Sequence, residues 1–239
     1  MGRKLCWTDG GNMAGTALAT ENETVGFYNG QTNREVYIVE QITVQPKYLY
    51  SAMKRCFDFV FALVGLIVCA IPIAVIAIVI KVDSRGPIFF RQERLGLNGR
   101  PFMMYKFRSM REDAEKDGPQ WAERNDDRCT RVGIFLRKTR LDEIPQLLNI
   151  LHGEMSFVGP RPERAVFYRE FEQYIVGFSQ RMLVKPGLTG HAQVNGGYDL
   201  LPEEKILFDM EYIKQRSFSM DLKCLLKTVM IVFSHEGAR

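Results

Sequence analysis

One long uncharged stretch dominates the pattern of hydrophobic and polar positions along the chain. Residues 59–80 form an apolar run of 22 residues, and about 20 such residues span the hydrocarbon core of a bilayer. Pro72 lies inside this run, where it lacks a backbone donor and clashes with the carbonyl of Val68. We therefore expect a helix break that leaves arms of roughly 8 to 13 residues, each too short to cross about 30 Å alone.

Two paths through a membrane fit this run. Lys54 and Arg55 precede it, and Lys81 and Arg85 follow it, so positive residues flank both ends. Because positive flanks favour the cytoplasmic side, a re-entrant hairpin would keep both ends there. Membranes also tolerate a spanning helix with a proline kink, so the residue pattern leaves both paths open.

The segments around the apolar run predict shorter elements. Residues 35–44 have the composition of a β-strand that joins a sheet edge or packs on a partner. Two short extended runs on either side of Asn98-Gly99, the second at residues 102–110, predict a β-hairpin. Residues 111–127 are polar and helix-prone, and we interpret their acidic side chains as a solvated helix face.

Helical patterns return in the second half of the chain. Residues 166–175 look like an amphipathic helix, and a further helix from Pro202 carries Asp209. Residues 221–233 are apolar with a basic edge, which suits a helix lying in a membrane interface. A buried core helix explains that last pattern equally well.

Composition and charge narrow the choice of partners. The 239 residues carry a formal charge of +4, but residues 81–111 hold eight basic and only two acidic side chains. A basic block directly after an apolar run suggests anionic lipid or a phosphorylated substrate at a membrane surface. We find no zinc spacing, helix-turn-helix pattern or RNA-binding signature, so we expect no nucleic acid partner. The five scattered cysteines are typical of reduced thiols facing a cytoplasm.

Two adjacent carboxylates, Asp142 and Glu143, follow a cluster of basic residues. Pro145 fits best in a first helical turn, so we expect a helix that starts near Asp142 and continues through Ile150. Such an end attracts phosphate, and the carboxylates could attack phosphorus or hold a divalent cation. Asp142 would equally serve as an N-cap, so a structural role stays open. The preceding basic residues are Arg137, Lys138 and Arg140.

Two later loops carry further candidate ligands for an anion. Arg161 lies between Pro160 and Pro162, and this rigid mount suits a phosphate contact, although a structural turn with an exposed arginine is the alternative. Glycines in residues 185–196 permit close backbone approach to a ligand. His191 in that loop is either an acid or base or simply an exposed side chain.

Five motifs occur in a characteristic order: GPIFFRQER (86–94), YKFRSM (105–110), LDEIPQ (141–146), GPRP (159–162) and KPGLTG (185–190). The chain resembles the monotopic bacterial sugar transferases, which are polyprenyl-phosphate phosphoglycosyl transferases, from about residue 54 to residue 233. The resemblance implies an α/β fold with a re-entrant membrane helix, a small β-hairpin and a helical cytoplasmic catalytic core with amphipathic interfacial helices. It favours the hairpin, with Pro72 at its kink, over the spanning helix.

The resemblance also implies an activity, which is transfer of a sugar-1-phosphate from a UDP-sugar to polyprenyl (undecaprenyl) phosphate. Asp142 inherits the role of nucleophile on the β-phosphorus, and Glu143 assists with magnesium or proton handling. Both carboxylates are the implied ligands of Mg²⁺. The expected contacts to substrate phosphate are Arg137, Arg161 and Lys106, and weaker candidates are Asp209, Asp221 and Arg108.

The family pattern further implies three parts: an N-terminal extension (1–50), partly mobile, a membrane helix hairpin (51–82) and a catalytic domain (83–239) on the cytoplasmic face of the bacterial inner membrane. Expected partners are the UDP-sugar, polyprenyl phosphate and membrane lipid, while a homodimer stays open.

Two departures and two rivals qualify the resemblance. Ile71 stands where many relatives have Ser, and His191 stands where the family often has Trp. A rival from another class is an inactive membrane-anchored scaffold, which the intact Asp142 and Glu143 disfavour. A multi-span transferase is the rival among enzymes, and the single deeply apolar segment disfavours it.

Overall fold

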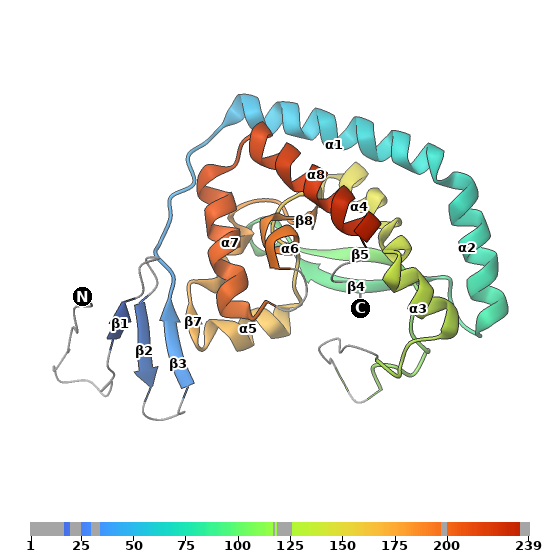
Figure 1. The fold of residues 1–239 in the computed structure, drawn as a ribbon, viewed down its shortest axis with the longest axis horizontal. Coiled ribbons are helices and arrows are strands. Elements are labelled where there is room, and N and C mark those ends of the chain that lie inside the picture. Colours follow the sequence, from blue (N-terminus) through green and yellow to red (C-terminus); the bar gives the residue numbers. More distant parts are fainter. Residues whose placement is uncertain are drawn as a thin grey trace.

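Helices form an arc around a small set of strands in the computed structural model (Figure 1). The structure describes residues 17–19, 25–29, 34–116, 118, 126–196 and 200–234. The mixture of helices and strands agrees with the expected fold class. Residues 1–16 lie outside the described residues, and with them the expectation of a mobile opening.

The apolar run folds into two helices, α1 (Tyr48–Val68) and α2 (Ala70–Asp83). The helix axis bends by 59° between them. The predicted break is present, but it lies at Cys69 and not at Pro72, and the arms of 21 and 14 residues are longer than expected. Proline is tolerated in a first helical turn because its missing donor would be unpaired there. Pro72 therefore sits in the first turn of α2, and the break falls just upstream.

Neither arm is a membrane span by itself. Within the described residues, no single helix combines the length and apolarity needed to cross a bilayer, and only α1 and α2 taken together reach them. Large apolar residues along both helices are exposed, among them Ile67, Val68 and Ile71.

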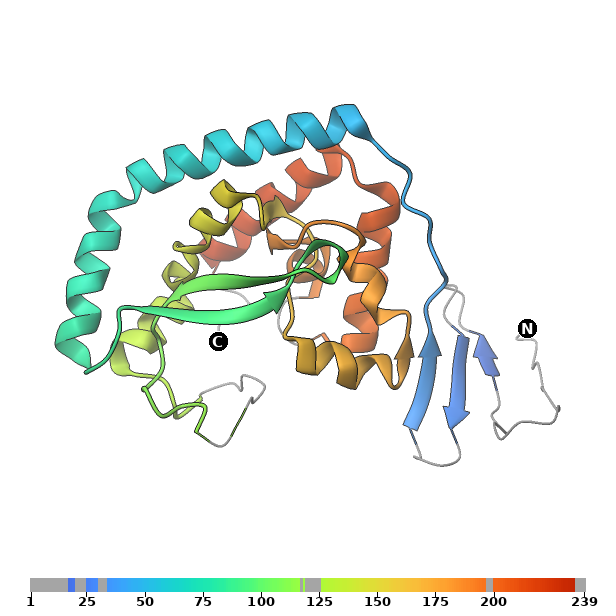
Figure 2. The same ribbon diagram turned by 180° about the vertical axis from the view of Figure 1, so that it is seen from behind.

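The predicted β-hairpin is confirmed. Strands β4 (Phe89–Leu95) and β5 (Pro101–Phe107) pair antiparallel, with Leu95 opposite Pro101, and the short 3₁₀ turn η1 (Leu97–Gly99) joins them. Asn98 has φ of 54°, a left-handed conformation that asparagine tolerates better than most residues. Figure 2 shows this hairpin lying beneath the arc of α1 and α2.

The prediction of a helix at residues 111–127 is wrong for the described part of that segment. Residues 112–116 form turns, and the backbone N–H of Arg111 donates to the carbonyl of Arg128 because the chain doubles back there. Residues 117 and 119–125 of the predicted helix lie outside the described part of the chain. The next helix, α3 (Arg131–Lys138), begins after Thr130, whose hydroxyl accepts a hydrogen bond from Gly133 N–H at 2.9 Å.

The second half of the chain packs inside the arc. Its elements are η2 (Leu141–Glu143), α4 (Gln146–His152), β6 (Ser156–Val158), α5 (Ala165–Glu172), β7 (Ile175–Val176), η3 (Phe178–Leu183), β8 (Gly187–Thr189), α6 (His191–Gly196), α7 (Pro202–Gln215) and α8 (Phe218–Ser234). Strands β6 and β8 pair parallel. The predicted helix at 166–175 is shorter than expected, since Ile175 belongs to a strand.

The predicted strand at 35–44 is also shorter, because β3 (Arg34–Ile38) ends early. It lies between β2 (Val25–Asn29) and β7 in a sheet of order β1-β2-β3-β7, where β1 is Ala17–Ala19. The strand therefore joins the N-terminal segment to the rest of the chain. The division of the chain at residues 50 and 82 stays a prediction.

Polar side chains fasten α1 to the interior. Arg55 donates to the carbonyls of Ile150 and Leu151 at 2.7 and 2.8 Å, and so caps the C-terminal end of α4. Asp58, which is buried on the same helix, accepts hydrogen bonds from the Ser156 hydroxyl and the Phe157 N–H. These bonds hold the arc against the strands and loops beneath it.

Candidate active site

Asp142 and Glu143 lie in the short turn η2 between α3 and α4. This is a correction, because the helix begins at Gln146, after Pro145, and does not start near Asp142. Arg140 has φ of 58°, and this left-handed residue turns the chain sharply away from α3. The two carboxylates therefore project from a tight turn and not from the first turn of a long helix.

Asn149 fixes this turn against the hairpin. Its side chain donates to the carbonyl of Met103 at 2.7 Å and accepts from the N–H of Tyr105 at 3.0 Å. The fully buried Asn149 thus gives the backbone of β5 the partners that another strand would provide. Lys106, the next residue on β5, is held beside the acidic pair as a result.

Glu143 is clamped by two cations. Its Oε1 accepts from Lys106 Nζ at 2.9 Å and also forms an ion pair with the guanidinium of Arg161. Burial alone would raise the pKa of this carboxyl, but Arg161 and Lys106 outweigh that effect and hold the pKa well below its ordinary value. Glu143 is therefore a permanent anion at neutral pH.

Asp142 is as buried as its neighbour but is bonded differently. The residue is 7 % exposed, and none of the described residues donates a hydrogen bond to its carboxylate. Burial, together with the negative charge of Glu143, raises the pKa of Asp142 to about 6, although Lys106 and Arg161 oppose the shift. The result is a carboxylate that is charged near neutral pH and free to bond to a substrate.

A metal ion would find oxygen ligands here but no complete protein cage. Among the described residues no group of three histidine, cysteine or acidic side chains is placed to hold a metal. Mg²⁺ commonly takes one or two carboxylates and fills its remaining positions with substrate phosphate oxygens and water. The pair of Asp142 and Glu143 fits that mode of binding.

Arg161 is held by its backbone. The Arg181 guanidinium donates to the carbonyl of Arg161 at 2.9 Å and also pairs with Asp209 at 2.6 Å. Burial opposes the charge on Arg181, but Asp209 outweighs it and keeps the pKa of Arg181 above its ordinary value. The buried pair therefore supports the loop that carries Arg161.

The glycines near Arg161 serve packing. A Cβ at Gly187 would lie 2.1 Å from the backbone nitrogen of Gly159, and one at Gly190 would lie 2.2 Å from the Gly159 carbonyl oxygen. The expected close approach is therefore between two segments of this chain, as β6 and β8 pair. This contact brings the loop of Arg161 to the acidic pair.

Some of the predicted site residues lie close to the acidic pair, and others lie away from it. The structure brings Lys106 and Arg161 into contact with Glu143, next to Asp142. Arg137 lies on α3, where its charge acts on Asp142 and its guanidinium donates to Cys129 Sγ at 3.1 Å.

The weaker candidates lie elsewhere. Arg108 donates to the carbonyl and hydroxyl of Ser84 at the end of α2. Asp209 belongs to the pair behind Arg161, and Asp221 joins helices around α1. His191 pairs with Glu211 at 3.1 Å on α7.

Sequence reasoning missed three residues whose side chains bond to the backbone of segments around the site: Asn149, Arg181 and Asp58. One signal for Asn149 was available, because its amide interrupts the leucines and isoleucine of residues 147–151 in α4. Neither Arg181 nor Asp58 stands out by spacing, since their partners lie 28 and 98 residues away.

The fold and the site define a mixed helix-and-strand protein with a buried acidic pair among cations, next to a bent apolar helix pair. Residues 49–235 match the family model of the bacterial sugar transferases, and the chain belongs to that family.

Named relatives agree with this assignment. The chain is 40% identical over 200 residues to a UDP-glucose:undecaprenyl-phosphate glucose-1-phosphate transferase of Caulobacter vibrioides, covering 81% of this chain and 74% of the relative. It is 41% identical over 191 residues to a protein of the same name in Escherichia coli, covering 78% and 41%. A UDP-N-acetylgalactosamine-undecaprenyl-phosphate N-acetylgalactosaminephosphotransferase of Aeromonas hydrophila is 39% identical over 197 residues, covering 81% and 47%. The chain thus spans less than half the length of two of these relatives.

Proposed function

We propose that this protein transfers a sugar-1-phosphate from a UDP-sugar to polyprenyl phosphate, giving polyprenyl-diphospho-sugar and UMP. The observation that carries the proposal is that Asp142 is a buried carboxylate without a hydrogen-bond donor among the described residues. Beside it lies Glu143, which is paired with Lys106 and Arg161. The names of the relatives in Caulobacter vibrioides and Aeromonas hydrophila supply the substrate class.

The reaction proceeds in two displacements on one phosphorus atom. A carboxylate oxygen of Asp142 bonds to the β-phosphorus, and the bond from that phosphorus to the bridging oxygen breaks, so that UMP leaves with the electron pair. An oxygen of polyprenyl phosphate then bonds to the same phosphorus, and the bond to Asp142 breaks. Each step exchanges one oxygen–phosphorus bond for another, so no external acid or oxidant is needed.

The cations of the site stabilise the charge that develops on the phosphoryl oxygens. Arg161 is held from behind by Arg181, and Lys106 is held on β5, so both are positioned before substrate binds. We propose that Asp142 and Glu143 hold Mg²⁺ together with the donor's phosphates. When bound, the ion neutralises phosphate charge and orients the diphosphate.

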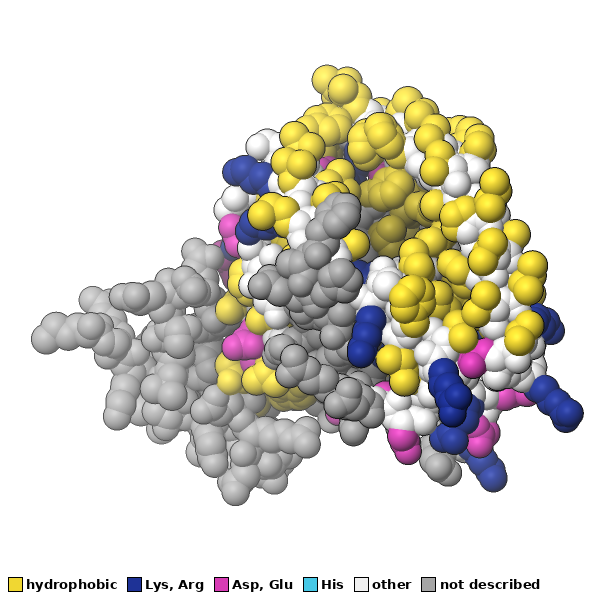
Figure 3. Space-filling model, turned by 45° about the vertical axis from the view of Figure 1, so that its right-hand side comes forward, with side chains coloured by type: hydrophobic (Ala, Val, Ile, Leu, Met, Phe, Trp, Pro, Cys, Tyr) yellow, Lys and Arg dark blue, Asp and Glu magenta, His cyan; other side chains and the backbone are white. Residues whose placement is uncertain are grey.

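The apolar surface supports a membrane location. Figure 3 shows hydrophobic side chains along the arc of helices and across a hollow beside it. We propose that α1 and α2 enter the cytoplasmic leaflet of the bacterial inner membrane and return, with α8 in the interface. Exposed large apolar residues on these helices include Phe61, Ile67, Ile71, Ile78, Leu226 and Met230.

This location would place the protein at the first membrane step of a surface polysaccharide or glycoconjugate pathway. The relatives named above use different sugars, so the donor must be found by assay. The rival is a scaffold on the same fold that binds lipid without turnover.

Release of UMP tests the proposal. Purified protein in nanodiscs is given undecaprenyl phosphate, Mg²⁺ and a panel of UDP-sugars, and UMP is measured for the native protein and for Asp142→Asn. We expect UMP with at least one donor from the native protein only. Absence of UMP with every donor, although the protein is folded and binds the nanodisc, would favour the scaffold.

A further inference from the structure

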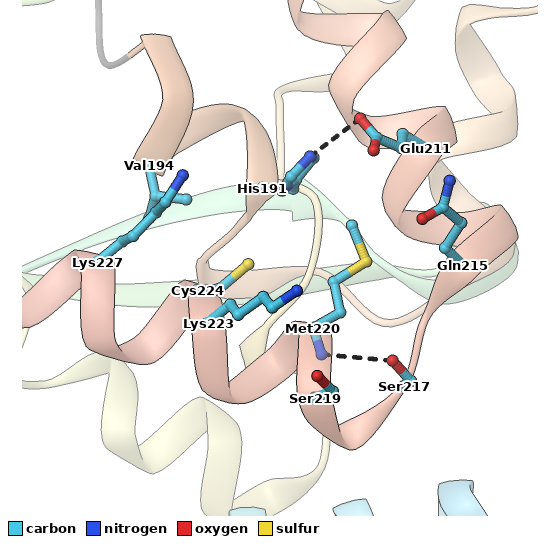
Figure 4. A pocket seen from close by; sticks show the side chains of 10 residues that line it. All are labelled: His191, Val194, Glu211, Gln215, Ser217, Ser219, Met220, Lys223, Cys224 and Lys227. Atoms are coloured by element: carbon cyan, nitrogen blue, oxygen red, sulfur yellow. Dashed lines mark hydrogen bonds and ion pairs between the residues drawn. The ribbon is translucent and has the colours of Figure 1, made fainter.

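A cavity lies between α6, α7 and α8, outside the cluster around Asp142. It has a volume of about 220 Å³, which is smaller than the roughly 300–1,000 Å³ of sites for drug-sized ligands. The cavity therefore suits a small group. Its lining residues are His191, Val194, Glu211, Gln215, Ser217, Ser219, Met220, Lys223, Cys224 and Lys227 (Figure 4).

The charged groups around this cavity favour an anion. Lys223 and Lys227 lie one turn apart on α8, and Figure 4 shows both side chains crossing the cavity side of the helix. Glu211 is the one acidic residue of the lining, and it faces His191 at 3.1 Å. Two cations and two hydroxyl-bearing serines thus outnumber one carboxylate that is already engaged.

The two lysines differ in their hydrogen bonds, because Lys227 is oriented by a partner and Lys223 is not. Lys227 Nζ donates to Asn195 Oδ1 at 2.6 Å, and the Asn195 amide donates to the backbone carbonyl of His191. Lys223 has no hydrogen bond or ion pair among the described residues. An ammonium group without a partner at the edge of a cavity can bind an incoming anion at little cost.

The apolar face of α8 indicates where the anion comes from. Leu222, Leu226 and Val229 are exposed on one face of the helix. Because successive residues turn by about 100°, Lys223 borders that face, about 90° from its centre, and Lys227 lies further round the helix, about 130° from the centre. If the apolar face lies in the interface, as the proposed function holds, the long side chains of both lysines can reach the depth of the lipid phosphates.

We propose that this cavity binds the phosphate group of an anionic membrane lipid, held by Lys223 and Lys227. The site is distinct from that of the reacting phosphates, and it anchors α8 at the membrane surface. Free phosphate offers the same chemistry, so the test must separate the two sources. The inference rests on the membrane location in the proposed function but not on turnover.

The test uses full-length Asp142→Asn protein with isotope-labelled histidine, because His191 lines the cavity and the chain has only three histidines. The His191 resonance is assigned by its loss in His191→Gln. It is then followed in nanodiscs of pure phosphatidylcholine, in nanodiscs with increasing phosphatidylglycerol, and in phosphatidylcholine with inorganic phosphate. We expect a saturable shift with phosphatidylglycerol only.

Variants separate this site from general surface charge. Lys223→Gln with Lys227→Gln should weaken the phosphatidylglycerol response at least about tenfold, since each lysine that is lost would be a charged donor to the lipid phosphate. The control Lys81→Gln with Arg85→Gln also removes two charges, at the far end of α2, and should respond like the parent protein. Ser219→Glu keeps both lysines, suits the first turn of α8, and should also weaken the response.

Three results would overturn the proposal. They are an equal response to inorganic phosphate, an equal response in the two double variants, and no response at all. UMP release from otherwise native protein is measured in parallel. If the otherwise native protein releases no UMP but the His191 response is intact, the result counts against the proposed function alone. If UMP is released but the His191 response is absent, the result counts against this site alone.

Discussion

Two aspartates with the same exposure, Asp142 and Asp221 at 7 % each, lie in opposite surroundings. Asp221 accepts hydrogen bonds from the hydroxyls of Tyr50 and Tyr212, both at 2.8 Å, and from Lys54 at 2.7 Å. Asp142 accepts none from the described residues, although cations lie near it. Burial by itself therefore does not distinguish the two carboxylates, and the presence or absence of donors does.

The difference in hydrogen bonding indicates different roles for the two aspartates. Asp221 connects α8 to α1 through Lys54 and to α7 through Tyr212, so its hydrogen bonds hold three helices together. Asp142 contributes nothing comparable to the packing, and its raised pKa shows that its charge is held at a cost. We expect substitutions at the two positions to separate activity from stability.

The largest expected effect is that of Asp142→Asn. Amide replacement removes the proposed nucleophile, so UMP release should fall by at least about 10³-fold. Thermal unfolding should occur at the same temperature or higher, because a buried charge is removed. A loss of activity that is explained by unfolding of the variant would erase the contrast with Asp221.

The next largest effect is expected for Arg161→Ala. Removing one donor that stabilises charge developing in a transition state typically costs about 10²–10³ in rate. Arg161→Lys, which keeps a charge but not the planar fork, should recover part of this loss. Rates are measured with saturating donor, and an unchanged rate in Arg161→Ala would show that the clamp on Glu143 does not contribute to transfer.

A smaller effect should appear with pH. Since the proposed attack on phosphorus needs the anionic form of Asp142, the rate should fall roughly tenfold per unit as the pH drops below about 6. Stability should respond in the opposite sense, because the folded pKa lies above the ordinary 3.8. Asp142 therefore favours the folded state most below that value, and its contribution is lost as the pH rises through about 6.

Paired pH profiles check the sign. Native protein and Asp142→Asn are unfolded with denaturant between pH 5 and pH 7. The native protein should lose stability relative to the variant as the pH rises through this window. A difference that is flat with pH, or that has the opposite slope, would show that Asp142 does not titrate there.

The smallest effect on activity is expected for Asp221→Asn. Three donors would lose a charged acceptor, so the free energy of unfolding should fall by about 1–3 kcal/mol. Below the unfolding transition, UMP release should stay close to that of the native protein. A large loss of rate in folded protein would show that the helix junction also controls the site around Asp142.

The sequence predicted those features that depend on neighbouring residues. The hairpin followed from Asn98-Gly99, and the bend followed from Pro72 within an apolar run, although the break lies at Cys69. The adjacent carboxylates and Arg161 were recognised by their basic and proline neighbours.

Features that depend on distant contacts could not be predicted. The pairing of Gly159 with the segment at Gly187, which delivers Arg161 to Glu143, joins residues that no local pattern connects. The support of Arg161 by Arg181 is of the same kind. Asp209 and Asp221 entered as site candidates because a sequence does not show which carboxylates already have partners.

The central claim is that Asp142 carries the sugar-phosphate during transfer. Its most direct test is the intact mass of the protein after incubation with the panel of UDP-sugars and Mg²⁺, without an acceptor lipid. We predict a sugar-phosphate adduct on the native protein and on Asp221→Asn, and none on Asp142→Asn. An adduct on Asp142→Asn, or UMP release by native protein that never carries an adduct, would contradict the account.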